Sequence, residues 1–372
     1  LVVLLLVLIT ALAMSPVPRA ATARDVVPGE LPMRLDDPEA NDPLGAQSGQ
    51  NVVYLEQQKV IASGSAGDQF GFAVAVDGNT ALVGAPYDNA DTGSVYVFAW
   101  DGRFWTFQQQ LFASDGQMGD EFGHAVALAG DTILVGAYGD DSGRGAAYVF
   151  ARSGSIWAQQ GKLRASDGEA YDYFGFAVAL DADTALVGAY RVDVGANDEQ
   201  GAAYVFTRSG TSWTEQQKLL ASDGAILDHF GKAVALDGDT VLVGAPEYDS
   251  STYYSLGAAY VFTRSGTVWT EQDQLLASDG ASADRFGISV ALDADTALVG
   301  AYGDDDYRGS AYIFTRGGTS WTEQQKLVAS DRAGLDQFGF SVALSGDTVL
   351  VGAPYDDART GSAYVFTHSG TG

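Results

Sequence analysis

The chain has 372 residues, of which 48 are acidic and 20 are basic, so its formal net charge is −28, while 46% of the residues are hydrophobic. This composition indicates a folded globular protein, and the charge argues against nucleic acids and anionic membrane surfaces as partners. The chain has no cysteine and only three histidines, which excludes disulfides, thiolate zinc sites and cysteine nucleophiles.

The first two segments of the chain lie outside any repeat. Residues 1–23 begin with an apolar run that is too short to cross a bilayer core comfortably and end in small residues, a pattern typical of a secretory signal peptide, with a signal anchor as the alternative. Residues 24–50 contain four prolines, several acids and no hydrophobic periodicity, so we expect a disordered linker. No second long apolar run follows. We therefore expect a secreted protein, extracellular or at the cell surface, with no membrane insertion once the signal is removed.

One pattern of about 50 residues returns six times within residues 51–372. Its first landmark is Phe-Gly, beginning at Phe70, Phe122, Phe174, Phe230, Phe286 and Phe338. Gly-Ala and Tyr-Val/Ile-Phe follow in every copy, and five copies continue into a segment that begins at Trp105, Trp157, Trp213, Trp269 or Trp321. We interpret these recurring phenylalanines and tryptophans as structural residues that fill the space between repeats.

Each repeat contains four short segments with alternating or compact apolar residues, separated by turn residues. Such segments are typical of strands, and the first two are joined by a connection short enough for a tight hairpin, such as Asp181-Ala182-Asp183. Four antiparallel strands repeated around a centre predict an all-β protein, a β-propeller of six four-stranded blades that occupies residues 51–372.

The sixth copy of the fourth segment stands at the opposite end of the array. Residues 54–60, Tyr-Leu-Glu-Gln-Gln-Lys-Val, repeat the register of residues 213–219, Trp-Thr-Glu-Gln-Gln-Lys-Leu, but precede the first Phe-Gly. We expect this N-terminal strand to complete the last blade and to close the propeller without an unpaired edge. Seven blades are the alternative, if a further repeat follows Gly372.

The combination of Phe-Gly, a hydrophobic strand and Gly-Ala-Pro resembles the FG-GAP repeat of integrin α-subunit propellers and of secreted bacterial FG-GAP proteins. The complete motif stands at Phe70 with Pro86, at Phe230 with Pro246 and at Phe338 with Pro354. The resemblance implies a propeller that serves in binding or adhesion. The calcium loop of many integrin blades is absent, because the connection between the first two strands is too short to supply its oxygen ligands.

The loops fall on two faces of such a propeller. The second-to-third and fourth-to-first connections share one face, which is rich in aspartate, and the recurring Arg-Ser/Gly-Gly turns lie on the other. We expect the aspartate two residues before each Phe-Gly to cap its loop. The alternative is a cation site between neighbouring acidic loops, with Ca²⁺ as the candidate ion and Asp115, Asp120, Asp140 and Asp141 as the candidate ligands.

Two loops on the acidic face are longer than the rest. Gly-Ala is followed by the next landmark glycine after eight residues in four copies and after twelve in the third and fourth, as from Ala245 to Gly257. Insertions on one face of a repeat array often mark the binding side. We therefore expect ligand contacts at Arg191, Asp193, Tyr248, Tyr253 and Tyr254.

The sequence favours a non-enzymatic binding or adhesion protein, because it contains none of the common catalytic motifs. We expect a monomer without a cofactor that recognises a protein or a polysaccharide through its acidic loop face. The alternative is a carbohydrate-active enzyme that uses carboxylates at the propeller mouth.

Overall fold

The computed structural model describes residues 58–62 and 67–368. The predicted signal peptide and linker lie outside the described residues, and so do residues 54–57 of the predicted closing strand.

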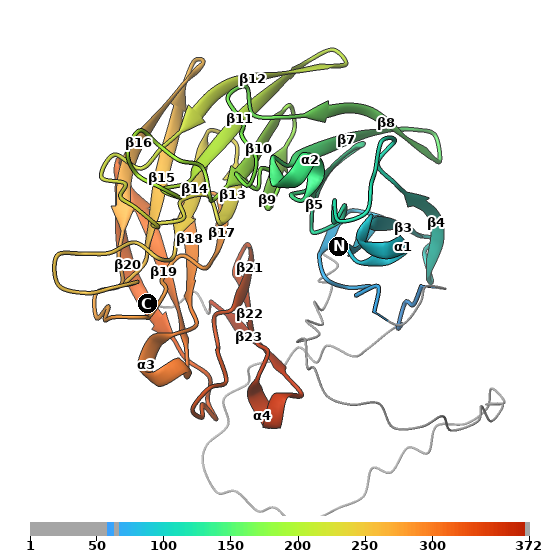
Figure 1. The fold of residues 1–372 in the computed structure, drawn as a ribbon. Coiled ribbons are helices and arrows are strands. Elements are labelled where there is room, and N and C mark those ends of the chain that lie inside the picture. Colours follow the sequence, from blue (N-terminus) through green and yellow to red (C-terminus); the bar gives the residue numbers. More distant parts are fainter. Residues whose placement is uncertain (1–57, 63–66, 369–372) are drawn as a thin grey trace, which may run out of the picture. The chain divides into compact units, whose positions relative to one another are not determined.

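The described residues form 23 strands in six antiparallel sheets, which follow one another in chain order (Figure 1). Blade one contains β1 (Val74–Asp77), β2 (Thr80–Ala85), β3 (Ser94–Trp100) and β4 (Trp105–Leu111). Blade two contains β5 (Ala125–Ala129), β6 (Thr132–Ala137), β7 (Ala146–Ser153) and β8 (Ile156–Leu163). Blade three contains β9 (Ala177–Asp181), β10 (Thr184–Ala189), β11 (Ala202–Ser209) and β12 (Ser212–Leu219).

The remaining blades repeat this arrangement. Blade four contains β13 (Ala233–Asp237), β14 (Thr240–Ala245), β15 (Ala258–Ser265) and β16 (Val268–Leu275). Blade five contains β17 (Ser289–Asp293), β18 (Thr296–Ala301), β19 (Ser310–Gly317) and β20 (Ser320–Leu327). Blade six has three strands among the described residues, β21 (Ser341–Ser345), β22 (Thr348–Ala353) and β23 (Ser362–Thr367).

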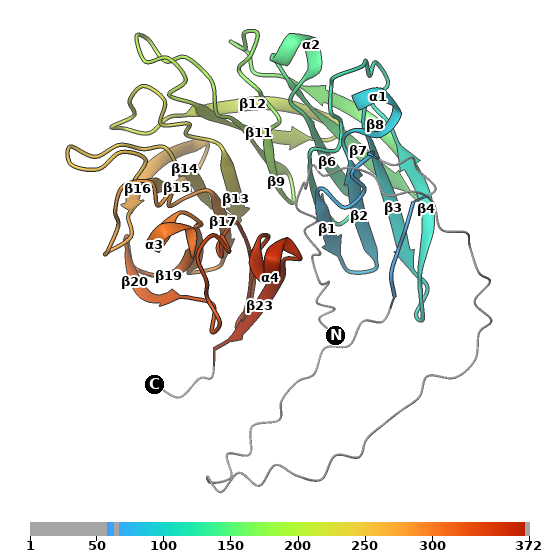
Figure 2. The ribbon, with the colours of Figure 1, turned by 60° about the horizontal axis from the view of Figure 1, so that its bottom comes forward.

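Four short helical turns follow the second strands of blades one, two, five and six, and Figure 2 shows two of them, α1 and α2, at the same end of their blades. They are α1 (Asp88–Asp91), α2 (Asp140–Gly143), α3 (Asp304–Tyr307) and α4 (Asp356–Arg359). The first strands β1, β5, β9, β13, β17 and β21 each contact the next in this order. The prediction of an all-β, six-bladed β-propeller is confirmed.

Local sequence explains the hairpins and the close approach of the blades. In blade three Asp181 pairs with Thr184, so the first turn has only two residues, and Ala182 has a φ of 47°. The glycine of each Phe-Gly is needed for space: Gly231 has a φ of 95°, and a Cβ on it would lie 2.2 Å from the carbonyl oxygen of Ala202 in the preceding blade. Glycine is therefore the only residue that fits there without displacing a backbone.

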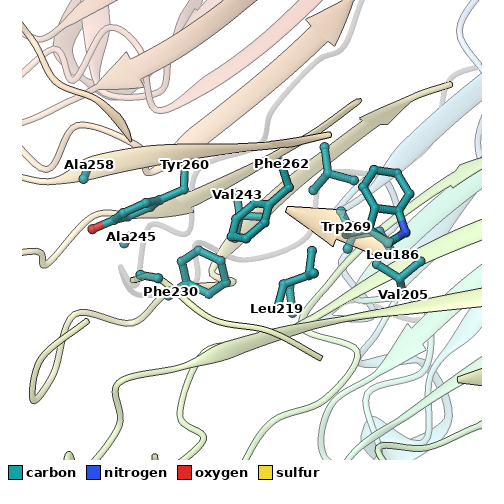
Figure 3. Close-up of a cluster of buried hydrophobic side chains, with 13 residues drawn as sticks. Leu186, Val205, Leu219, Phe230, Val243, Ala245, Ala258, Tyr260, Phe262 and Trp269 are labelled. Carbon is teal, nitrogen blue, oxygen red and sulfur yellow. The ribbon is translucent and has the colours of Figure 1, made fainter. Parts of the chain in front are cut away.

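The core lies between neighbouring blades. At the boundary between blades three and four, Phe230, Tyr260 and Trp269 of blade four pack against Leu186 and Val205 of blade three (Figure 3). The same composition returns at the other described boundaries, where Phe122, Phe174, Phe286 and Phe338 are fully buried. Apolar burial between blades therefore supplies the main driving force for this fold.

Side-chain amides connect the outer strands of neighbouring blades. Gln217 on β12 donates to the Trp269 carbonyl and accepts from the Trp269 backbone N–H, both at 2.8 Å. Gln109 makes the same two bonds to Trp157. At the boundary between blades two and three the equivalent position is Gly161, and Trp213 is only partly buried there, with an indole nitrogen that has no hydrogen-bond partner.

We expect Gly161→Gln to stabilise the protein by about 1 to 2 kcal/mol. The new side chain would make the two missing hydrogen bonds, each worth about 1 kcal/mol, and would remove a glycine from the interior of a strand. The space is available, because no atom lies within 4 Å of a Cβ placed on Gly161. Urea denaturation of the variant, with Gly161→Ala as the control for the glycine effect alone, measures the gain. Equal stability of the two variants would contradict the hydrogen-bond explanation.

The face opposite the acidic loops is held by arginines. Arg208 bonds to Asp183 of its own blade, donates to the Thr132 hydroxyl of the preceding blade at 2.9 Å and stacks over the Trp213 ring. Arg152, Arg264 and Arg316 make the same three contacts in their blades. These cations therefore connect blades and are already neutralised by their partners.

Candidate functional site

At five of the six Phe-Gly sites, the aspartate two residues before the phenylalanine caps its own loop. Asp228 accepts a hydrogen bond of 2.6 Å from the Ala225 backbone N–H, and Asp120, Asp172, Asp284 and Asp336 accept the equivalent bond. The cap prediction is confirmed. Burial raises the pKa of Asp228 and of Asp284 to about 6. These carboxyl groups are nearly inaccessible, so they hold the loops and do not face a ligand.

We expect Asp228 and Asp284 to raise the free energy of unfolding as the pH falls from about 7.5 to about 5, whereas the buried neutral His124, whose pKa is lowered to about 4, opposes this gain. The folded-state pKa of Asp228 and Asp284, about 6, lies above the ordinary value near 4, so the folded protein binds these protons more tightly. Their stabilising contribution is complete below about pH 4 and is lost as the pH rises through about 6. Thermal denaturation across this range measures the effect.

The variant Asp228→Asn assigns that pH dependence to one group. It keeps the shape of the cap without a charge, so it should be more stable than the unmodified protein at pH 7.5, by up to about 2 kcal/mol, and should gain less on acidification. Asp141→Asn, an exposed aspartate on the same face, is the control. A pH dependence in Asp228→Asn equal to that of the unmodified protein would contradict the assignment.

The first aspartate of each fourth-to-first loop is bound to the next blade. The Tyr148 hydroxyl donates to Asp115 at 2.9 Å, and Lys162 forms an ion pair with Asp115 at 2.8 Å, which lowers the pKa of Asp115. The same tyrosine-to-aspartate bond returns as Tyr204 to Asp167, Tyr260 to Asp223, Tyr312 to Asp279 and Tyr364 to Asp331. Each of these carboxylates thus makes a contact that joins its loop to the next blade.

The four predicted metal ligands do not form a cation site. Lys162 bridges Asp115 and Asp140, each at 2.8 Å, and Arg164 bonds to Asp140 at 3.0 Å. Asp120 caps its loop, and Asp141 lies 3.6 Å from Arg144. Within residues 58–62 and 67–368, no group of three or more histidine, aspartate or glutamate side chains could hold a metal. Lysine and arginine occupy the place that a cation would take, which the sequence spacing could not reveal.

An aromatic belt lies on the acidic face where the first strands begin. His124 lies between Phe72 and Phe176, with ring centroids 4.8 and 4.7 Å away, and Tyr138 contacts it at 4.6 Å. Phe176 continues to Tyr190 at 4.6 Å. Burial lowers the pKa of His124 to about 4, so its ring is neutral at physiological pH. The belt therefore presents an apolar surface across blades one to three.

A charged cluster continues the belt into blade four. His229 lies 3.0 Å from Glu199 and 3.1 Å from Glu247, and its ring packs against Tyr190. Lys232 pairs with Glu247 at 3.1 Å, and Arg191 pairs with Glu199. The cluster fixes the inserted loop of blade three, which carries Glu199, to blade four. Sequence inspection missed the residues directly after each Phe-Gly, such as Phe72, His124 and Lys232, although their repeated position was a signal that could have revealed them.

The structure separates the predicted ligand contacts into two groups. Arg191 is ion-paired and stacks on Tyr173, Asp193 accepts the Glu199 backbone N–H at 2.8 Å, and Tyr248 packs against Tyr260. These three side chains hold their own loops. Tyr253 and Tyr254 are exposed, at 41% and 77%, at the tip of the inserted loop of blade four. They are the two members of the set that are free to contact a partner.

The six repeats of this chain match a known sequence family. The model of the FG-GAP repeat matches residues 54–98, 105–150, 157–206, 213–262, 269–314 and 321–366. The chain belongs to the FG-GAP repeat family. Each match starts at a fourth-strand segment and ends with a third strand, so the first FG-GAP match begins at residue 54, as the internal register predicts.

Curated relatives of this FG-GAP chain are integrin α subunits. Integrin alpha-D of Homo sapiens is 25% identical over 272 residues, which cover 64% of this chain and 22% of the relative. Integrin alpha-2 of Mus musculus is 30% identical over 232 residues, which cover 56% of this chain and 19% of the relative. The chain thus spans about a fifth of the length of these relatives. Among the described residues of this FG-GAP chain, no helix has the length and apolarity to span a membrane.

Proposed function

We propose that this FG-GAP propeller is a non-enzymatic binding or adhesion protein, secreted or at the cell surface, that recognises a protein or a polysaccharide through its acidic loop face. The relatives' name, integrin alpha, supports an adhesion role in an extracellular setting. The proposal rests above all on the contrast between the two faces of the blades.

The two faces differ in which side chains remain accessible to a partner. On one face, four arginines are paired with aspartates of their own blades and donate hydrogen bonds to the preceding blades. On the acidic face, Asp115, Asp167 and Asp279 each keep about half of their side-chain surface exposed although they are paired. Tyr253 and Tyr254 are exposed on the same face. Tyrosine provides a large contact area at a low entropic cost, and the carboxylates attract basic partners.

The inserted loops cannot be trimmed without damage to the fold. Val192 and Gln200 in the loop of blade three are buried, and Leu256 in the loop of blade four is buried as well. From the sequence alone, shortening both loops to the spacing of the other blades is expected to leave the melting temperature unchanged. The burial of these residues predicts a loss of stability instead, so single side chains are the better probes.

We expect Tyr253→Ser with Tyr254→Ser to weaken binding at least tenfold, which corresponds to about 1.4 kcal/mol, and to leave the melting temperature within about 2 °C. Both side chains are exposed, Tyr253 at 41% and Tyr254 at 77%. Candidate ligands come from a glycan array and a displayed peptide library, and affinity is measured by calorimetry. The control is Ile156→Ser with Val268→Ser, which removes exposed apolar side chains from the opposite face. Undiminished affinity in the tyrosine variant would remove these residues from the site.

The enzyme alternative is tested by turnover on the same polysaccharides. Release of products from a polysaccharide, abolished by single aspartate substitutions on the acidic face, would overturn the binding-only proposal. Asp228 and Asp284, whose raised pKa would suit a general acid, are buried in loop caps, so they cannot reach a glycosidic bond.

A further inference from the structure

A large apolar side chain stands exposed at each of the five described boundaries between blades, and we call this set the apolar crown. Its members and their exposed fractions are Met118 at 79%, Tyr171 at 63%, Ile226 at 54%, Leu227 at 50%, Tyr254 at 77% and Leu335 at 62%. All lie in second-to-third or fourth-to-first loops, on the acidic face. One exposed apolar residue needs no explanation, but a repeated set on one face marks an interaction surface.

The backbone at these positions makes the apolar side chains unfavourable for folding. Tyr171, Leu227 and Leu335 have φ values of 72°, 65° and 74°, in the left-handed region. Glycine adopts this conformation without strain, and Gly119 does so at the first boundary with a φ of 89°. A leucine or tyrosine that is half or more exposed gains little from burial to offset the strain. Because the fold does not require this backbone strain, we take it as a sign that these side chains have a function.

The inserted loop of blade four provides the member of the apolar crown at the fourth boundary. At the fourth boundary the left-handed position holds Ala283, which is too small to project. The Ala283 backbone N–H donates to the Tyr254 carbonyl at 2.9 Å, and the Tyr254 backbone N–H donates to the Ser282 hydroxyl at 3.2 Å. The insertion thus supplies at this boundary the exposed apolar side chain that the fourth-to-first loop lacks.

The loops that carry the apolar crown are fixed before any partner arrives. Asp228 caps the loop of Leu227, and the Leu227 backbone N–H donates to the Asp198 carbonyl of the neighbouring loop at 2.9 Å. Carboxylates surround the crown: Asp167 and Asp279 are half exposed, and Glu169 beside Tyr171 is exposed. Contacts held in place in advance lose little entropy on binding.

We propose that the apolar crown contacts a protein partner whose surface is basic and contains apolar recesses. This deepens the proposed function on the same face and rests on it. Four crown members, Met118, Ile226, Leu227 and Leu335, are aliphatic and present no hydrogen-bonding side chain, whereas sugars are recognised through polar groups and aromatic faces. The net charge of −28 opposes a second copy of the chain as the occupant. The apolar crown therefore favours a protein over a polysaccharide as the partner.

The test uses two synthetic peptides of equal length and charge, one of lysine and leucine in an amphipathic pattern and one of lysine and serine. The unmodified protein should bind the lysine–leucine peptide at least tenfold more tightly. The variant Tyr171→Gly, Leu227→Gly, Leu335→Gly should lose this difference and keep the affinity for the lysine–serine peptide. Its melting temperature should be equal or higher, since glycine relieves the left-handed strain.

The control Ile156→Ser with Val268→Ser, on the opposite face, should keep the tenfold preference. An unchanged preference in the triple-glycine variant, or a lower melting temperature that shows these side chains to be structural, would overturn the proposal. Glycan-array binding that survives the triple substitution would leave the proposed function standing and reject the crown as the contact surface. Failure of the unmodified protein to bind any peptide or glycan would reject both.

Discussion

Replacing Trp269 by alanine should lower the free energy of unfolding by about 3 to 5 kcal/mol. The ring is 2% exposed and lies in the core between blades three and four (Figure 3). Its indole N–H donates to Gln216 of the preceding blade at 2.9 Å. The substitution removes this bond together with the apolar contacts, and the surrounding strands can refill the cavity only in part. Chemical denaturation measures the loss.

The matched variant Trp213→Ala distinguishes core packing from a general effect of tryptophan loss. The repeated pattern alone predicts the same loss of about 3 to 5 kcal/mol for Trp213. The structure leaves this ring partly exposed, its indole N–H has no partner, and Gly161 stands where Gln109 and Gln217 bind the tryptophan backbone of the next blade. The loss for Trp213 should therefore be smaller, about 1 to 3 kcal/mol. Equal losses for both variants would contradict the packing difference.

Deletion of residues 54–62 should lower stability by about 3 kcal/mol or more and promote association between molecules. Val60 and Ala62 pack against the core of blade one, as the equivalent Leu219 and Ala221 pack against that of blade four. Blade six has three strands among the described residues, and Val365 on β23 is 40% exposed, whereas Val205 at the same position of blade three is buried. The sequence predicts that residues 54–60 supply the missing fourth strand.

A deletion of equal length within the predicted linker, residues 30–38, is the control for the closure prediction. Light scattering measures association, and thermal denaturation measures stability. If the deletion of residues 54–62 leaves a monomer with the melting temperature of the control, the closure prediction is wrong.

Landmarks that repeat in every blade made the fold predictable from sequence. A run such as Thr-Ala-Leu-Val-Gly-Ala between turn residues is typical of a buried strand, and the two-residue turn at Ala182-Asp183 fixes the register of the first hairpin. Repetition also revealed the capping role of Asp228 and its equivalents, since a short polar side chain next to a turn has few other uses.

The site was harder to predict because its members take their roles from neighbouring blades. Asp115 and Asp140 looked like metal ligands until the structure placed Lys162 between them. Arg191 looked available for a ligand, but Glu199 neutralises it across the inserted loop. The apolar crown is equally invisible in sequence, since an exposed leucine and a buried one look alike until the backbone conformation is known.

Hydrogen exchange with a bound ligand tests the central claim most directly, which is that partners bind the acidic loop face. The ligand is whichever peptide or glycan from the screens binds the unmodified protein most tightly. The account predicts slowed exchange in the second-to-third and fourth-to-first loops, strongest around Tyr171, Leu227 and Tyr254, and unchanged exchange in the turns that follow Arg152, Arg208 and Arg264. Protection confined to those arginine turns or to the fourth strands would contradict it.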